Sequence, residues 1–110
     1  MGCYTRLTEK SATQSNGQKS FNLLDESNGC VKGACAGICM YMWTEYSNPG
    51  VHADQEGFYV IEGTGWAKVG DEEFRIYPDT SFIAPAGVPH TLKRDLDCAA
   101  VKIFWFHSAV

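Results

Sequence analysis

Two segments decide the fold: HADQEGFYVIEGTGW, from His52 to Trp66, and PAGVPH, from Pro85 to His90. In the first, a polar loop leads into a short apolar run of the kind that forms a β-strand, and the second is a Pro/Gly-rich turn at the start of another expected strand. His52 and Glu56 stand four residues apart before the first strand, and His90 follows the Pro/Gly-rich turn of the second segment. Two imidazoles and one carboxylate form a ligand set that suits divalent Fe, Mn, Ni or Zn. The segments therefore predict a metal site at the ends of two strands.

Short apolar runs separated by turn residues continue on both sides of these segments. We expect strands near residues 21–25, 35–45, 57–62, 64–69, 72–77, 80–84, 89–93 and 98–107. The Gly70-Asp71 pair predicts a two-residue hairpin, and the aromatic strand 98–107 is expected to be central or to face a dimer partner. No window carries a 3.6-residue period. Many closely spaced strands predict an antiparallel sandwich or barrel with room inside for one small ligand.

The length of 110 residues indicates one domain. Residues 8–20 are polar and aperiodic, so we expect 1–20 to be a flexible N-terminal arm, or an edge segment that needs a partner, and 21–110 to be a single domain.

Charge and composition narrow the partners and the location. The net charge is −4 and no basic cluster occurs, which speaks against nucleic acid and anionic membranes as partners. No apolar run is long enough to span a membrane, and the N-terminus lacks the apolar core of a signal peptide, so we expect a cytoplasmic protein. The five cysteines are expected to be reduced, and the spacing of Cys30, Cys35 and Cys39 favours small buried side chains over a zinc site.

The two segments resemble those of cupins, of the small single-domain RmlC-like or cupin 2 type, across roughly residues 36–107. The resemblance implies an all-β, double-stranded β-helix (jelly-roll) barrel. The first cupin motif is G-x5-H-x-H-x(3,4)-E-x6-G; Glu56 and Gly63 match its second half, and His52 takes the place of its second His. The second motif is G-x5-P-x-G-x2-H-x3-N, and it is matched at Pro85, Gly87 and His90.

Four motif positions depart from the family pattern: Thr44 and Asp79 replace glycines, Gly50 replaces the first His, and Arg94 replaces the final Asn. The missing His reduces the three-His, one-Glu set that the resemblance implies to His52, Glu56 and His90. Two alternatives remain open: this smaller set binds a divalent ion with open positions, or the cavity binds an organic ligand directly. A shift of the loop would bring in Asp54 as a substitute ligand.

Other side chains would belong to the site only if they faced the cavity. His107 is expected at a strand end or an interface, although facing the cavity it would be an acid–base group. Tyr41 or Tyr59, if it points inward, would donate a hydrogen bond to a ligand. Arg75 and Lys68 would neutralise an anionic substrate if they faced the cavity, but a solvated sheet face is the expected place for both.

The resemblance implies a mononuclear metal-dependent enzyme, of the dioxygenase, isomerase or lyase type, that acts on a small polar organic molecule. The alternatives are a non-catalytic small-molecule or metal-binding sensor, and a structural dimer without a working site. No acid–base pair stands out, so no catalytic residue is named. A homodimer is expected because strand 98–107 is apolar and exposed sheet edges need cover.

Overall fold

The computed structural model describes residues 2–110, and in them nine β-strands alternate with turns. The strands are β1 (Thr13–Ser15), β2 (Gln18–Leu24), β3 (Cys35–Tyr41), β4 (Glu56–Glu62), β5 (Gly65–Val69), β6 (Glu72–Ile76), β7 (Ser81–Ala84), β8 (His90–Arg94) and β9 (Val101–His107). Two 3-10 turns span Leu7–Glu9 and Glu26–Asn28. In this part of the chain, no helix has the length and apolar character needed to cross a membrane.

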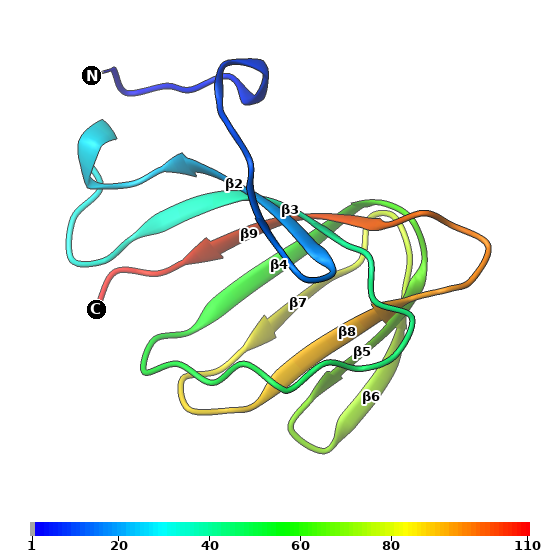
Figure 1. Ribbon diagram of the computed structural model, residues 1–110. Coiled ribbons are helices and arrows are strands. Elements are labelled where there is room, and N and C mark those ends of the chain that lie inside the picture. The colour runs from blue at the N-terminus through cyan, green and yellow to red at the C-terminus, as the bar shows by residue number, and fades with distance from the viewer. Residues whose placement is uncertain (1) are drawn as a thin grey trace.

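The strands form two antiparallel sheets that face each other as a barrel (Figure 1). One sheet has the order β1-β2-β3-β9-β4-β7 and the other has the order β6-β5-β8. Neighbours in the sheets are mostly distant in sequence, as in a jelly roll. The predicted all-β, double-stranded β-helix (jelly-roll) fold is confirmed.

The eight predicted strands all occur, with ends that differ by a few residues. Strand β9 begins at Val101 and is central, between β3 and β4. Gly70-Asp71 joins β5 to β6 as the expected two-residue hairpin. Strand β3 ends at Tyr41 rather than near residue 45, because the following backbone bonds outside the ladder: the carbonyl of Trp43 accepts from the Arg94 N–H at 2.8 Å.

The polar N-terminal segment contributes a hairpin to the edge of the larger sheet. Residues Thr13–Ser15 form β1, which was not among the predicted strands, and β2 begins at Gln18, before the expected residue 21. The turn between them needs Gly17, whose φ of +78° disfavours a side chain and whose missing Cβ leaves space for the Trp43 ring. A polar β1 is compatible with an edge position, because all three of its residues are exposed. Flexibility of residues 1–20 stays a prediction.

The core lies between the two sheets and follows the alternation of inward and outward side chains. Val60, Ile76, Val101 and Ile103 have no exposed surface, and Cys39 beside them is equally buried, in agreement with its expected role as a small apolar side chain. On β4 the inward residues are buried and the outward ones, such as Tyr59, are exposed. The same alternation places Glu56, the first residue of β4, on the inner side.

Candidate metal centre

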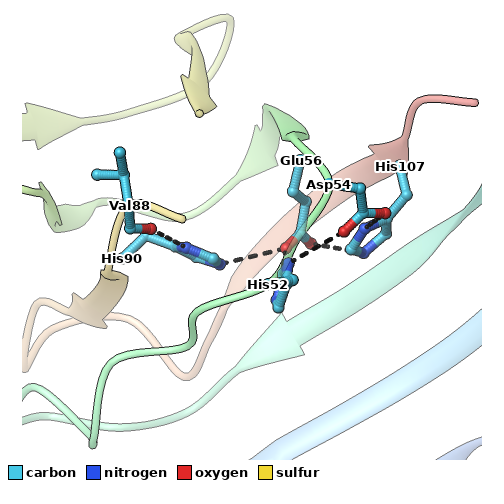
Figure 2. Close-up of polar contacts among 6 residues, drawn as sticks. All are labelled: His52, Asp54, Glu56, Val88, His90 and His107. Atoms are coloured by element: carbon cyan, nitrogen blue, oxygen red, sulfur yellow. Dashed lines mark hydrogen bonds and ion pairs between the residues drawn. The ribbon is translucent and has the colours of Figure 1, made fainter. Parts of the chain in front are cut away.

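Three strand ends and one loop bring five polar side chains together at one end of the barrel (Figure 2). Glu56 begins β4, His90 begins β8 and His107 ends β9. His52 and Asp54 come from the loop before β4. Because β4 and β9 run antiparallel in register, Glu56 is paired directly with His107.

Two of the three predicted ligands, His52 and His90, converge on a single oxygen of the third, Glu56. The Nε2 atom of His90 lies 3.2 Å from Oε1 of Glu56, and the Nε2 atom of His52 lies 3.5 Å from the same oxygen. One ligand atom from each residue lies within 4.8 Å of the other two. The structure thus brings the predicted residues together, and their role as metal ligands stays a prediction.

The orientation of His90 is set by its own backbone. Its Nδ1 lies 3.2 Å from the Val88 carbonyl, so the tautomer with hydrogen on Nδ1 donates there and leaves the Nε2 lone pair directed at the site. Two backbone hydrogen bonds with Gly50, of 2.9 and 3.0 Å, fix the turn itself. In the protonated ring Nε2 donates to Glu56, and this hydrogen bond raises the pKa of His90 above its usual value, against the opposing effect of burial. A position that favours a proton also favours a metal cation.

The carboxylate of Glu56 is the strongest reason to expect a cation. It is the one buried charged residue in the described chain, with 7% of its surface exposed. Its ion-pair partners are three imidazoles, of which none carries a permanent charge. A buried carboxylate without a positive partner costs several kcal/mol. This donor set of nitrogen and carboxylate oxygen atoms fits a divalent ion of the Fe, Mn, Ni or Zn type.

His107 ends β9, as expected, but its ring faces the site, which is the alternative that the sequence left open. Its Nδ1 lies 2.9 Å from Oδ2 of Asp54, and its Nε2 lies 3.6 Å from Oε2 of Glu56. Partial burial works to raise the pKa of Asp54, but the hydrogen bond and charge of His107 outweigh it, so that pKa lies below its usual value. His52, Asp54 and His107 also meet the distance criteria for a second ligand group that shares His52. No local sequence signal could show this, because only the pairing of β9 with β4 brings His107 beside Glu56.

Gly50 occupies the place of the first motif His and faces the same site. A Cβ atom at this position would lie 3.4 Å from Nε2 of His90 and 3.7 Å from Nε2 of His52. A side chain here would therefore point between the two imidazoles. Glycine keeps this side of the candidate centre open to the pocket.

The pocket next to the cluster has a volume of about 330 Å³, which is within the usual range for small-molecule sites. Its lining residues come from six strands and from the loop before β4: Gln18, Ser20, Tyr41, Trp43, Ser47, Asn48, Gly50, His52, Glu56, Phe58, Phe82, His90, Thr91, Leu92, Trp105 and His107. Two of them, Gln18 and Ser20, belong to the N-terminal hairpin, so this hairpin forms part of the pocket wall.

The remaining candidates divide between the two faces of the sheets. Tyr41 lines the pocket, whereas Tyr59 faces outward and its hydroxyl donates to Asp79. Arg75 pairs with Asp95 away from the pocket, as expected for a residue on a sheet face. The Lys68 ammonium lies 5.4 Å from the ring centroid of Tyr46, also outside the pocket.

Fold and site together define a cupin. The family model described as a cupin domain matches residues 40–107, which is more than half of the chain, and the chain therefore belongs to the cupin family. No match was found among curated proteins.

Solved structures share the fold at low sequence identity. Hydroxypropylphosphonic acid epoxidase from S. wedmorenis in complex with fosfomycin has a TM-score of 0.79 and 15% identity over 96% of this chain and 58% of that one. Fe(II)-HppE with the alternative substrate (S)-1-HPP has a TM-score of 0.80 and 14% identity over 96% and 59%. The cupin domain of Cnp3 from Schizosaccharomyces pombe has a TM-score of 0.78 and 19% identity over 96% and 72%. The chain spans less than three fifths of the length of each of the first two proteins.

Proposed function

We propose that this chain is a mononuclear metal-dependent enzyme, of the dioxygenase, isomerase or lyase type, that acts on a small polar organic molecule. His52, Glu56 and His90 would hold a divalent Fe, Mn, Ni or Zn ion. The observation that carries the proposal is the convergence of two imidazole Nε2 atoms on one buried carboxylate oxygen, at 3.2 and 3.5 Å, without a lysine or arginine among its ion-pair partners in residues 2–110.

The surroundings suit catalysis better than permanent metal storage. Three protein ligands leave coordination positions open, and Gly50 keeps them accessible from the pocket. When bound, a divalent ion supplies Lewis-acid polarisation of a substrate oxygen, and Fe(II) adds the capacity to activate O2. The chain itself orients His90 through the Val88 carbonyl and His107 through Asp54. His107 is thereby placed to exchange a proton with a bound molecule through Nε2.

The comparisons support the metal in general terms. One similar structure holds Fe(II) and another is an epoxidase. At 14–15% identity this likeness extends to the fold, so neither the iron nor the phosphonic acid substrate is transferred to this chain.

The second candidate function is a non-catalytic binding or sensing module. It is favoured by the composition of the pocket wall: apart from the clustered imidazoles and Glu56, no acidic or basic side chain of the described chain lines the pocket. Turnover separates the two functions. Oxygen uptake and product formation would be followed with a panel of small acids and diketones on the metal-loaded protein.

The first experiment is metal analysis by inductively coupled plasma mass spectrometry. Untagged protein purified without chelator would be compared with the His52→Ala and His90→Ala variants, and with Asp71→Asn, in an exposed turn, as a control. We expect near-stoichiometric metal in the wild type and in Asp71→Asn, and background levels in the two histidine variants. A wild type that stays metal-free after reconstitution would contradict the proposal.

We further propose that the protein is a cytoplasmic homodimer. Support for the dimer comes from apolar side chains on the outer face of neighbouring strands β4, β7 and β9: Tyr59, Ile83 and Phe106 are 40–44% exposed. Sedimentation velocity of the wild type and of Ile83→Lys tests this. A wild type that sediments as a monomer at micromolar concentration would rule out the dimer.

A further inference from the structure

The pocket beside the candidate metal centre has an uncharged polar wall. Apart from the cluster, hydrogen-bonding groups of the wall come from neutral residues such as Gln18, Ser47, Asn48 and Thr91. Among residues 2–110, no lysine or arginine lines the pocket. A site for a carboxylate or phosphate ligand usually offers a cation or a cluster of backbone N–H groups.

The cations nearest in sequence to the wall are engaged elsewhere. The Lys19 ammonium lies 5.8 Å from the ring centroid of Phe21. Arg94, which ends β8, donates from Nε to the Met42 carbonyl at 2.9 Å and from Nη1 to the Cys98 carbonyl at 2.7 Å. The Lys93 ammonium lies 4.6 Å from the ring centroid of Tyr46. These contacts hold the positive charges outside the pocket.

Negative charge, by contrast, is concentrated at the cluster. Glu56 faces the pocket and Asp54 lies directly behind it through His107. Glu56 would cancel one charge of a bound divalent ion and nearby Asp54 would lower the remaining positive potential, so that the loaded site would attract an anion less than an aqueous ion does. The electrostatics of the site therefore favour a neutral ligand.

Aromatic side chains form the rigid part of the wall. The Trp105 ring lies against Gly37, where a Cβ would collide with it. The Trp43 ring lies against Gly17 and its Nε1 donates to the Asn16 carbonyl at 3.0 Å. Both indoles are thus held in place before a ligand arrives, and flat aromatic surfaces pair favourably with a ligand ring.

Tyr41 adds one hydrogen-bond donor to this wall. It lies on the inner side of β3, and burial raises the pKa of its hydroxyl well above the usual value. The phenol therefore stays neutral and protonated at physiological pH, in keeping with the rest of the wall.

We propose that this pocket takes an uncharged small molecule with an aromatic ring and two neighbouring oxygen donors, the oxygens facing the metal centre and the ring lying between Trp43 and Trp105. The oxygen contacts rest on the proposed function, whereas the preference for a neutral aromatic ligand rests on the pocket wall alone.

The test uses two probes with one carbon skeleton, neutral mandelamide and anionic mandelate. Their affinities for the zinc-loaded protein would be measured by isothermal titration calorimetry. The ratio of the mandelate affinity to the mandelamide affinity would then be compared with the same ratio for zinc ions in water. Zinc is chosen because it has no redox chemistry. We expect the ratio on the protein to lie at least about tenfold below the aqueous ratio, because the pocket offers an anion no cation.

Two variants of one pocket residue control the interpretation. Gln18→Lys is expected to raise the ratio about tenfold by adding a positive charge, and the neutral Gln18→Met is expected to leave it unchanged. A wild-type ratio equal to or above the aqueous one would overturn the proposal, as would a failure of both probes to bind at millimolar concentration.

Metal content of the same samples separates this proposal from the proposed function. If the protein retains none of Zn, Fe, Mn or Ni after reconstitution, the metalloenzyme proposal fails, and the comparison moves to the metal-free protein. There, tighter binding of mandelamide than of mandelate would still support the neutral pocket, and the reverse order would overturn it.

Discussion

The carboxylates at the two ends of the barrel have different kinds of partner. At the end that holds the turns at residues 63–64 and 77–80, Asp95 accepts two hydrogen bonds from Arg75, of 2.8 and 2.7 Å, and one of 2.6 Å from Thr64. These partners lower the pKa of Asp95 to about 2. At the site end, Glu56 and Asp54 face imidazoles only.

This contrast separates an end whose carboxylate is paired within the protein from an end that, in our proposal, is prepared for a ligand. A guanidinium carries a permanent positive charge, so Arg75 neutralises the charge of Asp95 within the protein. Imidazoles carry a charge only when protonated, and neutral imidazole is a metal ligand. We therefore expect the site end, unlike the Asp95 end, to exchange protons for a divalent cation.

The largest expected effect comes from the same carboxylate-to-amide change at the two ends. Glu56→Gln removes the anionic ligand, and we expect the dissociation constant for Zn2+ or Fe2+ to rise at least about a hundredfold. Asp95→Asn, at the far end, is expected to change it less than about twofold, because distant sites act independently. Competition with a chromophoric chelator measures both. Equal losses in the two variants would remove the distinction between the ends.

A smaller loss of metal affinity is expected when Asp54, which contacts His107 and not the proposed ion, is changed. Asp54→Asn weakens the hold on His107 and removes a negative charge close to the cluster, so metal affinity should fall about tenfold. The same chelator competition applies. A loss as large as that of Glu56→Gln would instead make Asp54 a direct ligand.

The open side of the site is tested at Gly50. In Gly50→His the new side chain points between His52 and His90, so we expect metal to be retained while mandelamide binding weakens at least about tenfold. Gly50→Ala is the control, because its Cβ would meet neighbours at ordinary contact distances of 3.4–3.7 Å. Calorimetry on zinc-loaded variants gives both values. Unchanged mandelamide affinity in Gly50→His would place the open positions elsewhere.

The smallest expected effect concerns the pH dependence of folding. Asp95 has a folded-state pKa of about 2, below its usual 3.8, so its contribution to stability is complete above about pH 4 and is lost as the pH falls toward 2. The stability difference between wild type and Asp95→Asn, from urea unfolding, should be constant between neutral pH and about pH 5 and shrink below about pH 4. The side chains of Asp95 and Arg75 are 26% and 41% exposed, so screening keeps the difference small. Asp71→Asn, in an exposed turn, should show no such trend.

Much of the fold could be predicted because the signals are local. Short apolar runs and their turns marked eight strands, and Gly70-Asp71 marked a hairpin. Strand β1 was not predicted because an exposed edge strand has no apolar face and therefore no alternation of apolar and polar residues. Its role in positioning Gln18 and Ser20 on the pocket wall became visible only in the assembled sheet.

Local sequence signals define the strand pattern, the turn that carries His90 and the spacing of His52 and Glu56, because each depends on neighbours a few residues away. The assembled fold was needed to show that His107 joins the site and that Tyr41, rather than Tyr59, faces the pocket. Both outcomes depend on the register of β9 between β3 and β4, since a shift of one residue would turn every side chain to the other face. That register is set by packing between strands that are far apart in the chain.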